Sequence, residues 1–268
     1  FYLFPLLLEW ISLEKNTMCS IVILKQSDSE WPIIIGANRD EMSERKSLPP
    51  GRHWPDRPHI FAGKDIQAGG TWIGINDYGL VCGVMNRINT LGPDPNKRSR
   101  GELVLDALEH ADANDALNAL VEIEKDSYRG FNILVADNMN AYWVKSDENS
   151  DIIEYYNIPD GLSMITAYDR NDVSSKRINN YLSKFSISSE PNPSENEWMN
   201  WEMLLGSTYT EDEDPMGAMC VKTDVGFNTV SSCLIALPGF QPNIALKKSI
   251  FRFANGAPDI NKYEDCDL

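Results

Sequence analysis

The chain has 268 residues and a formal net charge of −16, because 40 acidic side chains face 24 basic ones. Hydrophobic residues make up 42% and charged residues 24%, which is typical of a globular chain, and the length fits one sizeable domain or two small ones. Such an acidic chain repels phosphate backbones, so we expect no nucleic-acid partner. No apolar run reaches the roughly 18 residues of a membrane-spanning helix, so we expect no transmembrane segment.

Residues 1–17 differ in character from the rest of the chain. They are apolar but short, and they lack both a basic n-region and a small-residue cleavage site, so they do not fit a secretory signal. Met18 is followed at once by Cys19 and a strand pattern. We interpret 1–17 as an upstream extension outside the mature protein, and 18–268 as a single domain. A short extension docked on the domain and a cleaved pro-segment are the alternatives.

Two apolar, β-branched runs open the domain. Residues 19–25 and 31–37 predict a hairpin, and the polar motif Asn38-Arg39-Asp40-Glu41 follows its second strand. The next segment, rich in Pro, Arg and His, predicts an irregular loop to about residue 60.

The remainder alternates between strands and helices. Two helical pieces are predicted between about 99 and 121, with a break at 112–115, and further helices at 173–185 and up to Gly206. The predicted strands are 69–75, 79–86, 131–136, 141–145, 152–157, 163–168, 218–223, 229–237 and 249–253. This order predicts an α+β protein in which two antiparallel sheets lie between helical layers, a four-layer αββα sandwich.

The cysteines do not form a disulfide or metal pattern. They are Cys19, Cys82, Cys220, Cys233 and Cys266. An odd number at irregular spacing favours free thiols in a reducing compartment, so we expect a cytoplasmic protein. No CxxC pair occurs and the three histidines do not cluster with cysteines, so we expect no metal and no cofactor.

Cys19 is the first candidate for chemistry. Its small side chain permits removal of Met18, which leaves a thiol and a free α-amine on one residue. The amine has an ordinary pKa of about 7.7–8.0, so it can accept the thiol proton near neutral pH. The alternative is a small buried hydrophobe at the start of a strand.

The polar motif after the second strand is the next candidate. A hairpin of this length brings Asp40 back beside Cys19, where its carboxylate can orient the amine while Arg39 favours the thiolate. The alternative is a solvated turn.

Several motifs together resemble the NRDE family, also called the transport and Golgi organisation protein 2 family. The matching segments occur in family order and extend from Met18 to about Phe253. They are Met18-Cys19, Asn38-Arg-Asp-Glu41, Gly69-Gly-Thr-Trp-Ile-Gly74, Arg100-Gly-Glu-Leu-Val104, Gly130-Phe-Asn-Ile-Leu-Val-Ala-Asp137 and Ala218-Met-Cys-Val221.

That family in turn resembles the N-terminal-nucleophile (Ntn) hydrolases that cleave non-peptide amide bonds through an N-terminal cysteine. The resemblance implies the αββα fold, with Cys19 as nucleophile and Asp40 as the aspartate that binds its amine. It makes Asn86 the candidate for the oxyanion hole, and Arg177 resembles the arginine near the nucleophile.

The chain departs from those acylases at two positions. Their arginine three residues before the aspartate is Ala37 here, and Arg39, offered as its substitute, would point to the opposite strand face from Asp40. Their second site asparagine is Met164 here, with Asn171 as a substitute. The candidates for substrate contacts are Asn38, Trp72 and Asn171.

Three functions compete at this stage. The first is an amidohydrolase acting on a small-molecule amide. The second is a non-catalytic carrier of a hydrophobic ligand, since the family resemblance implies haem mobilisation or lipid homeostasis and hence haem as a ligand. The third is a membrane-trafficking partner, for which no amphipathic helix or basic patch stands out.

Overall fold

The computed structural model describes residues 19–90, 92, 94–148, 150–240 and 247–268, which form two antiparallel sheets. In spatial order, the six-stranded sheet contains β10 (Gly161–Ile165), β1 (Ser20–Lys25), β2 (Ile33–Met42), β11 (Phe227–Leu237), β12 (Ile250–Ala254) and β13 (Glu264–Asp265). The seven-stranded sheet contains β3 (Ser47–Gly51), β4 (Ile60–Asp65), β5 (Ile73–Asn76), β6 (Val81–Asn86), β7 (Phe131–Ala136), β8 (Ala141–Ser146) and β9 (Glu154–Asn157).

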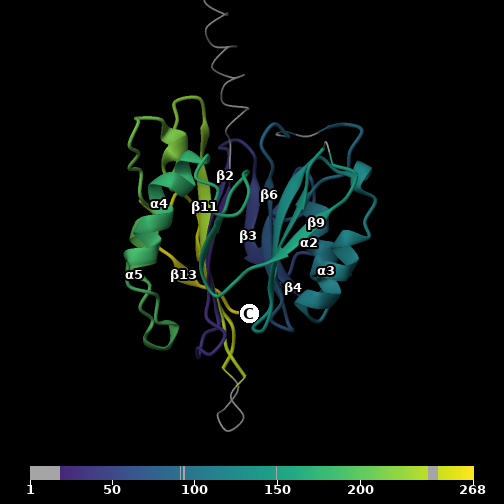
Figure 1. Ribbon diagram of the computed structural model, residues 1–268, viewed down its shortest axis with the longest axis horizontal. Coiled ribbons are helices and arrows are strands. Elements are labelled where there is room, and N and C mark those ends of the chain that lie inside the picture. The colour runs from purple at the N-terminus through teal and green to yellow at the C-terminus, as the bar shows by residue number, and fades with distance from the viewer. Residues whose placement is uncertain (1–18, 91, 93, 149, 241–246) are drawn as a thin grey trace, which may run out of the picture.

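Helices cover the outer face of each sheet (Figure 1). On the six-stranded sheet they are α4 (Lys176–Ile187) and α5 (Met199–Leu205), and on the seven-stranded sheet α2 (Gly101–Ala107) and α3 (Ala113–Val121). Short 3₁₀ turns are η1 (Lys125–Ser127), η2 (Pro193–Glu195) and η3 (Pro215–Gly217). This arrangement confirms the αββα prediction. Within the described residues, no helix is long and apolar enough to cross a membrane.

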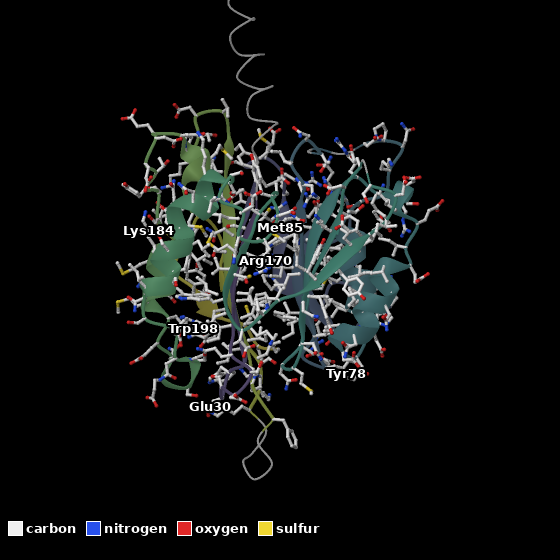
Figure 2. The ribbon with its side chains drawn as sticks, viewed as in Figure 1. Glu30, Tyr78, Met85, Arg170, Lys184 and Trp198 are labelled. Carbon is white, nitrogen blue, oxygen red and sulfur yellow. The ribbon has the colours of Figure 1, made fainter. Side chains whose placement is uncertain are left out.

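The core occupies three layers, one between the two sheets and one between each sheet and its helices. β1 and β2 are therefore buried on both faces. Ile23 and Ile35 pack between the sheets, whereas Val22 and Ile34 pack under the helices. Successive strand side chains point to opposite faces, so burial on both sides requires the continuous apolar runs seen in the sequence. Figure 2 shows Met85 between the two halves of the molecule and Lys184 on the outside of α4.

The polar motif lies inside β2 rather than after it. The sequence placed Asn38 to Glu41 beyond the strand, but β11 is long enough to pair with this stretch, Asn38 with Ser232 and Asp40 with Thr229. The ladder therefore continues to Met42, with a register shift between Thr229 and Ser231.

Three other local predictions were wrong. The loop expected before residue 60 contains β3, an edge strand that pairs only with β4 and whose register shifts at its two prolines, between Leu48 and Gly51. β4 itself was not predicted. Residues 218–223 form no strand, because their backbone bonds to a neighbouring loop and to Thr229 instead. The helix break at 112–115 is confirmed, since Asp112 caps the N-terminus of α3.

Candidate active site

A pocket of about 490 Å³ lies where β1 begins, and both sheets contribute to it. Arg39 lies in β2 of the six-stranded sheet, and Cys19 directly precedes β1. Met85 and Asn86 lie in β6 of the seven-stranded sheet, and Trp72 directly precedes β5. Met85, labelled in Figure 2, lines this pocket from its position between the two halves of the molecule. The topology therefore brings the sequence-predicted candidates Cys19, Arg39, Trp72 and Asn86 into one cavity.

The sulfur of Cys19 is the candidate nucleophile of this pocket. Its Sγ lies 3.7 Å from the backbone oxygen of Asp40, to which it can donate a weak hydrogen bond. Burial, and after it the Asp40 carboxylate, raise the pKa of the thiol to about 11, although the Arg39 guanidinium acts in the opposite direction. At neutral pH the sulfur is a thiol, so its reaction needs a base close by.

The carboxylate of Asp40 lies on the helix-covered face of β2, opposite the face from which Arg39 enters the pocket. Its Oδ2 is 2.7 Å from Nη2 of Arg177 on α4, and both side chains are 0% exposed. Thr229 donates a hydrogen bond from Oγ1 to Oδ1 of Asp40 at 2.5 Å. The Thr229 Oγ1 in turn accepts a hydrogen bond from the backbone N–H of Val221 at 2.8 Å. Burial raises the pKa of the Asp40 carboxyl, while the Arg177 guanidinium and the Thr229 hydroxyl oppose that shift. The weak sequence match at Arg177 thus marks a residue that contacts Asp40.

Arg39 faces the pocket, as the alternation of a strand requires. Its guanidinium carbon lies 4.9 Å from the centre of the Trp72 ring, in a cation–π contact. Its only carboxylate contact among the described residues is a loose one with Glu41, 3.6 Å from Nη2. Arg39 is 4% exposed, and its Nη1 has no hydrogen-bond partner in the described part of the chain.

Asn86 ends β6, in register with Phe131 of β7. Its side chain lines the same pocket as Cys19 and is partly exposed. Within the residues that the structure describes, the amide of Asn86 makes no hydrogen bond, so it can donate to a ligand.

Two of the three predicted substrate contacts lie elsewhere. Asn38 faces the helical layer, and its Nδ2 donates to the backbone oxygens of Leu205 and Met219, each at 2.9 Å. Asn171 has a positive φ of 59° and accepts the backbone N–H of Met164, which makes it a turn residue. Neither lines the pocket, whereas Trp72 does.

Sequence reasoning missed two residues that the structure brings to this region. Thr229 binds Asp40 from a strand 189 positions away in the chain, and its only sequence signal is a run of polar residues within a buried strand. Arg100 lines the pocket beside Gly101 and was noticed only as part of a family motif.

Two antiparallel sheets enclosed by helices form the fold of this chain, and a solved amidase structure shares it. The solved structure of the Caenorhabditis elegans N-acylethanolamine-hydrolyzing acid amidase ortholog matches with a TM-score of 0.51, over 84% of this chain and 94% of that chain. The two sequences are 15% identical, so the likeness shows the fold alone.

The family model described as Transport and Golgi organisation 2 matches residues 18–213, and the chain belongs to that family. The Mus musculus homolog is 33% identical and the Homo sapiens homolog 34% identical, each over 135 residues. Each alignment covers 48% of this chain and 45% of the relative, so it spans less than half of either protein. The resemblance stated from the motifs is confirmed.

Proposed function

We propose that this protein is an amidohydrolase that uses Cys19 as an N-terminal nucleophile to cleave a non-peptide amide bond. The observation that carries the proposal is the position of the Cys19 sulfur in a pocket that also contains Asn86. The reaction requires the mature form in which Met18 and the residues before it have been removed, so that Cys19 has a free α-amine.

The reaction would proceed through an acyl-thioester. The α-amine accepts the thiol proton as Sγ attacks the carbonyl carbon of the substrate, and the side-chain amide of Asn86 donates to the oxyanion that forms. The ammonium then protonates the leaving nitrogen, and the C–N bond breaks. Water, deprotonated by the same amine, then attacks the thioester. The C–S bond breaks, the carboxylic acid is released, and the ammonium returns the proton to the sulfur.

The polar pair behind the nucleophile has a positioning role in this scheme. The raised pKa of the thiol makes an adjacent base necessary, and the α-amine of Cys19 is the group that would lie nearest. Asp40 would orient that amine as it becomes an ammonium, and Arg177 and Thr229 hold the carboxylate in place. Arg39, on the pocket side, favours the thiolate.

A kinetic comparison tests the proposal. Cys19→Ala should abolish the turnover of a fluorogenic N-acyl aminocoumarin, whereas Cys266→Ala, a half-buried thiol on the C-terminal segment, should keep it. Intact mass should show that the active preparation begins at Cys19. Equal turnover by the wild type and Cys19→Ala would refute the mechanism, and so would full activity in a preparation that retains Met18.

A non-catalytic carrier is the second candidate, and the apolar part of the pocket lining, with Trp72, Met85 and Phe227, favours it because these side chains can contact a hydrophobic ligand. Titration of the purified protein with haem and with a fatty acid tests it. Saturable one-to-one binding with no amide turnover would favour the carrier. Normal amidase turnover without such binding would remove it.

A further inference from the structure

The pocket has a charge opposite to that of the protein. The chain carries a net charge of −16, yet basic side chains outnumber acidic ones in the pocket lining. The basic ones are Arg39, Arg45, Lys97, Arg98, Arg100 and Arg129, and the acidic ones are Asp40, Glu41, Asp65 and Asp94. Most of the basic side chains have acidic or backbone partners, so the question is which guanidinium groups lack a compensating charge.

Several of these side chains are neutralised by close carboxylates. Arg45 lies 2.7 Å from Asp65, and Arg98 lies 2.7 Å from Glu102. Arg129 pairs with Glu148 at 3.2 Å. Direct ion pairs of this kind leave little positive charge for a ligand.

Arg100 differs from them in its partners. Its guanidinium donates to the backbone oxygens of Thr90 and Gly130, each at 2.9 Å, and more weakly to the Thr90 hydroxyl and the Gly92 oxygen. None of its partners among the described residues is a carboxylate. Burial, together with the neighbouring Arg129, lowers the pKa of Arg100 to about 10.

Arg39 is the second such group. Its Nη1 is buried without a hydrogen-bond partner in the described residues, and Trp72 and the loose Glu41 contact hold the side chain in place. A buried guanidinium N–H without an acceptor costs free energy that a bound anion recovers. Arg39 and Arg100 both line the pocket that contains Cys19.

We propose that Arg39 and Arg100 form an anion subsite in the Cys19 pocket, and that the amide substrate carries a carboxylate that binds there. This inference rests on the proposed function, whose substrate class it narrows from small amides to anionic ones. The guanidinium groups are held in place before the ligand arrives, so little side-chain entropy is lost on binding.

The shape and charge of the ligand group favour a monoanionic carboxylate. A carboxylate matches the planar fork of a guanidinium group. A dianionic phosphate ester would be attracted more strongly by the arginines and repelled more strongly by Glu41 and Asp65, and its greater charge makes it costlier to remove from water.

Binding to the Cys19→Ala variant tests the subsite without turnover. The probes are N-octanoylglycine, with its anion on the amine side, and N-octylsuccinamic acid, with its anion on the acyl side. Each is compared with its own methyl ester by isothermal titration calorimetry. At least one acid should bind about tenfold more tightly than its ester, and the preference should weaken at high salt.

Substitutions assign the preference to the two arginines. Adding Arg39→Gln or Arg100→Gln to Cys19→Ala should remove most of the difference between acid and ester, and Arg100→Lys should keep part of it. Arg52→Gln is the matched control, because Arg52 pairs with Asp77 at a separate site. Thermal unfolding checks each variant, and Arg39→Gln remains informative if Arg100→Gln does not fold.

Each outcome decides the question. No preference for either acid overturns the subsite, and so does a preference that survives both glutamine substitutions. Tighter binding of octyl phosphate than of either acid would overturn the inference that the subsite prefers a monoanionic carboxylate. A preference for an acid in binding, in a wild-type protein that hydrolyses no amide, would retain the subsite and reject the proposed function.

Discussion

Each face of β2 carries a buried charged side chain, Asp40 on the helix face and Arg39 on the pocket face, and the two differ in their partners. On the helix face, Thr229 donates a hydrogen bond to one carboxylate oxygen of Asp40, and Arg177 forms an ion pair with the other at 2.7 Å. On the pocket face, Arg39 has a loose contact with Glu41 and a guanidinium nitrogen without a partner among the described residues. The helix face therefore holds a close ion pair within the fold, whereas the ion pair of the pocket face is loose and leaves guanidinium N–H groups for a ligand.

This difference teaches how one short motif serves two purposes. Because strand side chains alternate, neighbouring residues of Asn38-Arg39-Asp40-Glu41 enter different layers. Asn38 and Asp40 bind the helical layer, while Arg39 reaches the cavity. The buried pair fixes the strand beside Cys19, and the pocket arginine remains available.

The largest expected effect is a difference in the free energy of unfolding between substitutions on the two faces of β2. Arg177→Met should lower the free energy of unfolding by about 3–5 kcal/mol, because it leaves the Asp40 carboxylate buried without its ion-pair partner. Arg39→Met should lower it by less than about 1 kcal/mol, because the methionine keeps the contact with Trp72 and removes an incompletely paired charge. Urea unfolding measures both, and equal losses would break the comparison.

Asn86→Ala should act on catalysis and not on stability. Loss of one oxyanion donor lowers kcat by about 10²–10³-fold, and the folded state loses no hydrogen bond found in the described residues. Asn157→Ala, on the exposed edge strand β9, is the control and should leave kcat unchanged. A kcat for Asn86→Ala within threefold of the wild type, roughly a noise-level change, would remove Asn86 from the mechanism.

Thr229→Val should lower the free energy of unfolding by about 1.5–3 kcal/mol, since it removes a hydrogen bond to a buried carboxylate. The valine also leaves the Val221 N–H without its acceptor. Thr229→Ser keeps the hydroxyl and should cost less. If valine and serine cost the same in thermal unfolding, the hydroxyl has no role in holding Asp40.

The smallest effect concerns thiol alkylation in the form that retains Met18. Burial raises the pKa of both Cys19 and Cys266 to about 11. Iodoacetamide should therefore label both slowly at pH 8, with rates that rise about tenfold per pH unit until pH approaches the pKa. Arg39→Gln removes a nearby positive charge, so it should raise the pKa of Cys19 and slow its labelling at pH 9.

Cys266 is the internal reference for that experiment, since its pKa is set by burial and by Asp265 and Glu264. Peptide mass spectrometry reports both thiols in one sample. Equal changes in the labelling of Cys19 and Cys266 would place Arg39 outside the electrostatic range of the pocket thiol.

Much of the fold could be predicted because the central strands are buried on both faces and therefore read as apolar runs. β1 and the start of β2 are of this kind. β3, with two prolines, has no such pattern, since an edge strand needs only one ladder. The end of β2 was missed because its pairing depends on β11, far away in the sequence.

The site was only partly predictable for a related reason. Motifs indicated Cys19, Trp72 and Asn86, which share the pocket. They could not indicate which face a side chain enters, so Asn38 was assigned to the substrate although it binds Leu205 and Met219. Contacts such as that of Thr229 with Asp40 arise only when distant strands pair.

The most direct test of the central claim is the trapping of an acyl group on Cys19. The purified protein is mixed with a p-nitrophenyl acyl ester, quenched in acid, digested and mapped by mass spectrometry. The account predicts a peptide that begins at Cys19 and carries the acyl mass on that residue. Acylation at other thiols only, or a Cys19 peptide that still carries Met18 and no acyl group, would contradict it.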